Sequence, residues 1–183
     1  MVTVDGFGVP VEVAGPEKGS VVVLLGAAHQ APAAYEGVCQ RLHTASLKTV
    51  VIGPDPRLTA KSVISILDSL EVRWALLVGD RMGGELAWEL AATRLDRFIG
   101  LVVIDRGHPK VADLTGAVRD EHCPPVELNT TALVSSSAAR AVAKASQRFV
   151  YGEYRIVDLL GRRNAADSTA QLAAEIVMRT STW

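Results

Sequence analysis

The stretch WALLVGDRMGGELAWEL, residues 74–90, decides the fold that we expect for this chain. Its apolar residues 75–78 predict a short buried strand of a parallel sheet. A tight turn with the pattern G-x-R-x-G follows at 79–83, and a helix is expected from about Met82. Glycines flank this turn because side chains there would collide with the neighbouring strand and helix. We therefore expect the middle residue, Arg81, to have a strained backbone at the top of the sheet.

The composition describes a folded globular protein. The chain has 183 residues, of which 49% are hydrophobic and 21% charged, enough to form one domain over residues 1–183 with its own core. The net charge of −1 gives no electrostatic basis for binding nucleic acid. No apolar run approaches the roughly 18–20 residues that span a bilayer, and the first residues do not resemble a signal peptide.

The cysteines and the spacing of motifs restrict which metals and cofactors we expect. Cys39 and Cys123 lie far apart and predict reduced thiols, which are typical of a cytoplasmic protein. We find no metal-ligand spacing, no phosphate-binding loop and no dinucleotide fingerprint, so we expect neither a metal nor a cofactor.

Strands and helices are predicted to alternate along the chain. Strands are expected at residues 20–25, 49–52, 75–78, 99–104, 130–134 and 154–159, and helices at 32–45, 60–70, 82–93, 138–150 and 170–179. Residues 2–4 and 9–13 predict an N-terminal β-hairpin, and residues 114–119 a short helix. This order predicts a three-layer α/β sandwich, with a mostly parallel sheet covered by helices on both faces.

A parallel sheet binds ligands in the crevice beyond the carboxyl ends of its strands. The loops expected there are 26–30, 80–82, 105–108, 135–137 and 161–164. We predict a binding cleft formed by Gly26, Ala27, His29, Asp80, Arg81, Met82, Asp105 and His108.

Four segments resemble the α/β-hydrolase superfamily, and the resemblance covers nearly the whole chain. They are VVVLLGAAH, VVIGPDPR, LLVGDRMGGELAWELA and RFIGLVVIDR, in this order. The turn G-D-R-M-G is one substitution away from G-x-S-x-G, the nucleophile elbow of that fold. The resemblance implies an α/β-hydrolase-like fold without a cap domain, because residues 105–126 leave no room for the helical cap.

The working residues of the superfamily do not match. The resemblance puts Arg81 at the nucleophile position, and a guanidinium group has no lone pair to attack a carbonyl carbon. It puts Asp80 and Leu25-Gly26 where a His and a His-Gly pair are usual. It puts residues 135–137, three serines, at the place of the acid, and Gly161-Arg162 at the place of the catalytic histidine. We therefore predict no catalytic residues in the usual positions.

Several interpretations of single residues remain open. Arg81 either clamps an anion, pairs with Asp80, Glu85 or Asp105, or points outward into an interface. His29 either bonds a ligand or is a solvated loop residue. Asp105 and His108 either form a dyad or serve the structure separately.

Weaker candidates lie in the later loops. Residues 135–137 are either a displaced nucleophile or a polar strand end, and Cys123 beside His122 is either a nucleophile or part of a rigid turn. Arg162-Arg163 is either a solvated loop or a positive cleft mouth.

Three functions follow from these observations. The first is a non-catalytic protein whose cleft binds a small molecule, such as an anion, or a protein partner. The second is an esterase-like hydrolase with a relocated catalytic set, for instance His29 with Asp105 or a serine of 135–137. The third is a subunit that pairs with an intact hydrolase or with itself.

Overall fold

The computed structural model describes residues 1–160 and 165–181. Its single described sheet has seven strands in the order β1-β3-β2-β4-β5-β6-β7. The strands are β1 Val11–Ala14, β2 Val21–Leu25, β3 Lys48–Ile52, β4 Ala75–Asp80, β5 Phe98–Ile104, β6 Thr130–Val134 and β7 Tyr154–Asp158. Strands β2 to β7 are parallel, and only β1 is antiparallel to its neighbour β3. The predicted mostly parallel sheet is confirmed.

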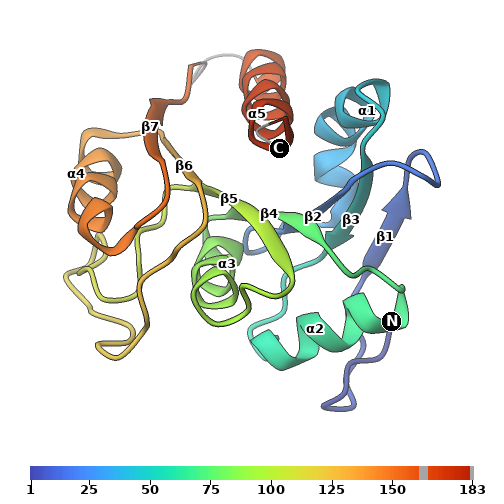
Figure 1. The fold of residues 1–183 in the computed structure, drawn as a ribbon, viewed down its shortest axis with the longest axis horizontal. Coiled ribbons are helices and arrows are strands. Elements are labelled where there is room, and N and C mark those ends of the chain that lie inside the picture. The colour runs from blue at the N-terminus through green and yellow to red at the C-terminus, as the bar shows by residue number, and fades with distance from the viewer. Residues whose placement is uncertain (161–164, 182–183) are drawn as a thin grey trace.

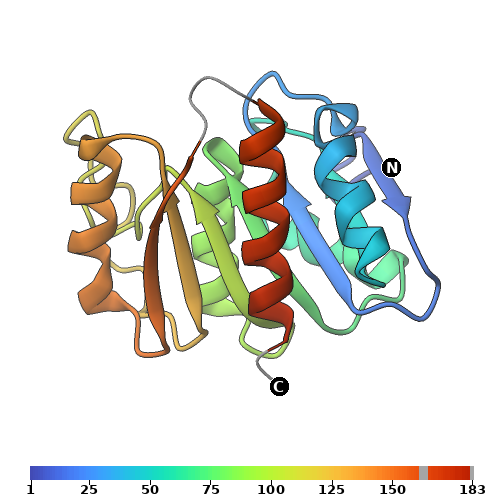
Figure 2. The same ribbon diagram turned by 90° about the horizontal axis from the view of Figure 1, so that it is seen from above.

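Helices cover both faces of this sheet. They are α1 Glu36–Thr44, α2 Ala60–Ser69, α3 Met82–Thr93, α4 Ser137–Ser146 and α5 Ala165–Thr180. Figure 1 shows α1 and α5 on one face and α2 and α3 on the other, and Figure 2 shows α5 and α1 in front of the strands. The three-layer α/β sandwich is therefore confirmed. Within the described residues, none of the helices is long and apolar enough to cross a membrane.

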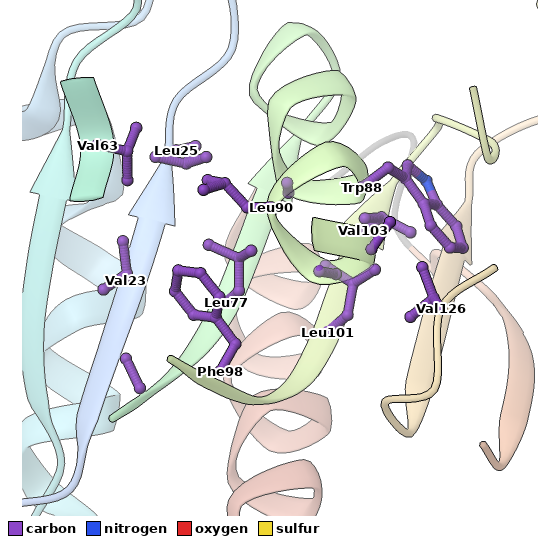
Figure 3. Packing of buried hydrophobic residues seen from close by; sticks show 14 of the residues in the cluster. Val23, Leu25, Val63, Leu77, Trp88, Leu90, Phe98, Leu101, Val103 and Val126 are labelled. Carbon is purple, nitrogen blue, oxygen red and sulfur yellow. The ribbon is translucent and has the colours of Figure 1, made fainter. Parts of the chain in front are cut away.

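The larger core lies between the sheet and the layer of α2, α3 and α4. Trp88 of α3 is completely buried there and lies against Val103 and Val126, as Figure 3 shows. Its indole N–H donates a hydrogen bond of 3.1 Å to the Arg106 carbonyl group, so this polar atom is satisfied inside the core. This packing fixes α3 against the ends of β4 and β5, where the candidate site lies.

Two predicted elements are wrong. Residues 9–13 do not pair with residues 2–4; instead Val11–Ala14 pairs with β3. The first residues form only a short antiparallel contact, in which a bridge joins Val2 to Gly8 and backbone hydrogen bonds join Met1 to Val9. The larger sheet offers Val11 and Val13 more neighbours than a two-stranded hairpin would.

The predicted helix at 114–119 is a turn. The Asp113 carboxylate accepts hydrogen bonds from the amides of Thr115 and Ala117 and from the Thr115 hydroxyl group. This local side-chain bonding competes with helix formation. The long connection from β5 to β6 therefore holds no helix, and no cap domain covers the sheet there.

Candidate functional site

The turn between β4 and α3 places Arg81 in a rare backbone conformation. Its φ of 48° and ψ of −105° lie outside the regions that side-chain-bearing residues normally adopt. The Arg81 amide donates to the Ile104 carbonyl group at 3.0 Å, and the Gly84 amide donates to the Arg81 carbonyl group at 2.9 Å. These bonds hold the sharp reversal from strand to helix that the sequence predicts.

The turn requires glycines because neighbouring atoms lie too close for a side chain at Gly79 or Gly83. A Cβ atom at Gly79 would lie 2.6 Å from the Cβ of Ala87, and one at Gly83 would run into the carbonyl group of Leu25. The turn therefore packs directly on the end of β2, and Arg81 is presented at the carboxyl edge of the sheet.

The Arg81 side chain pairs with two carboxylates. Its guanidinium group lies 2.8 Å from Asp80 and 3.9 Å from Asp105, with half of the side chain exposed. A cation at the start of a helix is unfavourable, and these carboxylates offset that cost. Of the three interpretations of Arg81, the ion-paired one describes the structure, although Glu85 pairs with Arg106 and Arg119 instead.

Tyr35 links the loop after β2 to this ion pair through two hydrogen bonds. Its hydroxyl group accepts a hydrogen bond from the Ala27 amide and donates one to Asp80, each 2.8 Å long. Burial, with smaller contributions that include the Asp80 charge, raises the pKa of Tyr35, so the hydroxyl group stays protonated. The amide of Ala27, a candidate for binding a ligand oxygen, is thus already occupied.

Asp105 is held by Ser135 from the neighbouring strand end. The Ser135 amide donates to one Asp105 oxygen at 2.8 Å, and the Ser135 hydroxyl group donates to the other at 2.5 Å. Asp105 also has a positive φ of 52°, which is uncommon for a residue other than glycine. The polar groups therefore form a chain from Tyr35 through Asp80, Arg81 and Asp105 to Ser135.

Two cavities flank the turn. The Arg81 pocket, about 630 Å³, lies between α1 and α5 and is lined by Tyr35, Asp80, Arg81, Ser135 and Leu172 among others. The α3 pocket, about 440 Å³, lies on the other side and is lined by Gly26, Met82 and Glu85 with the loops after β3 and β5. Of the eight predicted cleft residues, Gly26 and Met82 line the α3 pocket, Asp80 and Arg81 line the Arg81 pocket, and the other four line neither.

Comparison with solved structures identifies the architecture. An esterase from Exiguobacterium antarcticum has a TM-score of 0.75 at 14% identity, covering 95% of this chain and 97% of that one. An epoxide hydrolase from Vigna radiata has a TM-score of 0.73 at 13% identity, covering 96% and 95%. An alpha/beta hydrolase from Sphaerobacter thermophilus has a TM-score of 0.72 at 15% identity, covering 99% of both chains. This chain has the α/β-hydrolase fold. No family model and no curated protein sequence matches it.

The α/β-hydrolase fold explains why the turn, Asp105 and Ser135 meet at one edge, since each follows a parallel strand. It does not bring the predicted histidines there. His29, in the loop after β2, is exposed with a φ of 61° and has no hydrogen-bond partner among residues 1–160 and 165–181.

His108 lies outside the cleft, and its predicted place there is wrong. Its ring is completely buried, packs edge-on to Trp88 and is stacked with Phe149. One ring nitrogen accepts from the Lys110 amide at 3.2 Å and the other donates to the Pro124 carbonyl group at 2.8 Å. Burial, the largest cause, lowers the pKa of His108, so the ring is neutral and structural.

The weaker candidates also have structural partners. Burial, followed by the charges of Asp120 and Glu89, raises the pKa of Cys123 to about 11, which leaves its thiol protonated and unreactive. Ser135 and Ser136 follow β6, and Ser137 begins α4; Ser136 caps this helix by accepting from the Ala139 amide at 3.0 Å. Arg162 and Arg163 lie outside the described residues. Within the described ranges, no three His, Cys, Asp or Glu side chains are grouped to hold a metal ion.

Sequence reasoning missed Tyr35 and the ion cluster of Glu85, Arg106 and Arg119. Tyr35 falls within the helix predicted at 32–45, and nothing in the local sequence indicates a bond to Asp80. The position of Glu85 in the first turn of α3 gives no sign of partners that follow β5.

Proposed function

We propose that this is a non-catalytic protein of the α/β-hydrolase fold, which binds a small molecule in its former active-site cleft. The observation that carries the proposal is the state of Arg81. It occupies the position of the nucleophile in a degenerate nucleophile elbow, and its guanidinium group is held by Asp80 and Asp105. Such a group supplies no nucleophilic atom.

The surroundings of Arg81 support the same proposal. A nucleophilic hydroxyl group needs a base to remove its proton, and no histidine ring in the described part of the chain is hydrogen-bonded to Asp105 or Ser135. The Ala27 amide is engaged by Tyr35, which leaves the Met82 amide as the remaining donor for a developing oxyanion. A site with one amide donor and no nucleophile favours binding a ligand over catalysing a reaction.

Binding is proposed for the α3 pocket. Among the described residues, Asp80 lines the Arg81 pocket beside Arg81, and Asp105 lies 3.9 Å from the same guanidinium group. These two carboxylates already pair with Arg81, which disfavours the anionic ligand that the sequence suggested. The α3 pocket has the volume of a small-molecule site and an apolar floor that includes Leu25, Leu58 and Leu86. We therefore expect this cavity to bind a small molecule and not a protein surface.

A second candidate function rests on the short hydrogen bond between Ser135 and Asp105. In that case Ser135 Oγ attacks the acyl carbon of an ester while its proton passes to Asp105. The bond from the acyl carbon to the ester oxygen then breaks, and the departing alcohol takes that proton. Water hydrolyses the acyl-serine to a carboxylic acid and restores the Ser135 hydroxyl group. A carboxylate is a weak base for a hydroxyl group, and Asp105 already shares its charge with Arg81. This candidate is therefore the less favoured one.

Turnover assays separate the two functions. The solved relatives include an esterase and an epoxide hydrolase, so the substrates are an activated aryl ester and an aryl epoxide. The proteins are the wild type, Arg81→Ala, His29→Ala and Ser135→Ala. We expect rates equal to a heat-denatured control for all four. Turnover by the wild type that disappears in Ser135→Ala or His29→Ala would replace the proposal with the relocated hydrolase.

A further inference from the structure

The α3 pocket has an uneven balance of charge. Its lining contains four carboxylates and one basic side chain, Arg119. Asp55 is neutralised by Arg57 at 2.7 Å. Glu85 is neutralised by Arg106 at 3.0 Å and by Arg119 at 2.5 Å. Arg119, the basic side chain of the lining, is therefore already paired with Glu85.

Two carboxylates of the lining have no cationic partner. Glu89 comes from α3 and Asp120 from the β5–β6 connection, and neither forms an ion pair with any residue in 1–160 or 165–181. Lys110 lies over the Phe149 ring, 5.6 Å from its centroid, and Asp120 accepts a hydrogen bond of 2.8 Å from the His122 amide. Among the described residues, the pocket therefore carries two carboxylates without an ion-pair partner on one wall.

The two carboxylates lie close enough for their charges to repel each other. Partial burial, and after it the charge of Asp120, raise the pKa of Glu89. The thiol of Cys123, which lines the same wall, stays protonated and adds no charge. A ligand cation would relieve this repulsion, whereas an anion would increase it.

The floor of the pocket is apolar. Leu25, Ile52, Leu58, Met82 and Leu86 line it, and its volume of about 440 Å³ lies within the range of small-molecule sites. Such a floor takes up hydrocarbon by the hydrophobic effect, independently of charge.

We propose that the α3 pocket binds an organic cation with an apolar body, an alkylammonium group whose charge lies at Glu89 and Asp120. The hydrocarbon portion packs against Leu25, Leu58 and Leu86. This inference rests on the proposed function, because it names the ligand class of the same cleft. The carboxylates supply selectivity between ligands of different charge, and the floor supplies most of the affinity.

Calorimetric titration with three probes of matched shape tests the charge preference. The probes are hexyltrimethylammonium, hexanol and hexanoate. We expect the ammonium ion to bind more tightly than the alcohol, and the carboxylate to bind most weakly. Equal or tighter binding of hexanoate, or binding of none of the probes, would overturn the inference.

Charge-removing variants test the named residues. Glu89→Gln and Asp120→Asn should each weaken ammonium binding by about twofold to fivefold at low salt, since both groups are partly solvated. Hexanol binding should stay unchanged, and added salt should reduce the difference. Glu17→Gln is the matched control, because Glu17 is an exposed carboxylate in the turn before β2. Unchanged ammonium binding in both variants would overturn the inference. The ester and epoxide assays bear on the absence of catalysis alone, so the two proposals fail separately.

Discussion

The Tyr35 hydroxyl group donates a 2.8 Å hydrogen bond to the Asp80 carboxylate, although the two residues are 45 positions apart in the sequence. The same oxygen accepts from the Ala27 amide. Tyr35→Phe should destabilise the fold by about 1–3 kcal/mol, because it leaves buried polar atoms without a partner. Chemical denaturation measures this change. Tyr151→Phe is the control, since Tyr151 is 71% exposed. Equal free energies of unfolding for the two variants would contradict the role of the Tyr35 bond.

The positive φ of Arg81 predicts a difference between two substitutions at that position. Arg81→Ala and Arg81→Gly both remove the ion pairs with Asp80 and Asp105, but only glycine adopts this backbone conformation without strain. Arg81→Gly should therefore be more stable than Arg81→Ala by about 1 kcal/mol or more. Denaturation curves of the two variants decide the matter, and an alanine variant that is the more stable would show that the turn holds no strain.

Much of the fold could be predicted because its pattern is local. The turn at 79–83 and the apolar runs along the chain predict strands β2 to β7. Thr59 caps α2 by accepting from the Ser62 amide at 3.1 Å. The pairing of β1 could not be predicted, since the choice between a hairpin and the sheet edge depends on a distant strand.

The candidate site could be predicted only in outline. The topology placed Arg81 and Asp105 at one edge, but not the bonds of Tyr35 and Ser135, which join residues far apart in sequence. His108 was misplaced because a histidine after a strand end looks alike whether it faces a cleft or the core. Only the packing of Trp88 and Phe149 around it distinguishes the two.

Gly83 should tolerate no side chain. A Cβ atom there would run into the backbone of Leu25, which cannot move without breaking the sheet. Gly83→Ala should cost at least about 4 kcal/mol or prevent folding. Gly8→Ala is the control, because nothing lies within 4 Å of a Cβ atom at that position. Soluble expression and thermal unfolding compare the two, and a Gly83→Ala protein as stable as Gly8→Ala would contradict the packing of the turn.

His108 should make stability depend on pH in a defined direction. Its pKa is lowered in the folded state, so the unfolded chain takes up a proton more readily as the pH falls through about 6.5. Its stabilising contribution is therefore present above that pH and is lost below it, by at most about 1.4 kcal/mol per pH unit. Free energies of unfolding at pH 7.5 and 5.5 should differ less in His108→Gln than in the wild type. His29→Gln, at an exposed ring, should keep the wild-type difference. An identical difference in all three proteins would contradict the assignment.

The absence of an activated nucleophile is the central claim, and a labelling experiment tests it most directly. The purified protein is incubated with a reactive alkyl fluorophosphonate, and its intact mass is measured beside that of the Ser135→Ala variant. An unchanged mass for both proteins is the predicted result, because the proposal puts Arg81 where a nucleophile would be and no histidine ring is hydrogen-bonded to Ser135 in the described residues. A single stoichiometric adduct on the wild type that is missing from Ser135→Ala would contradict the account and identify Ser135 as a relocated nucleophile.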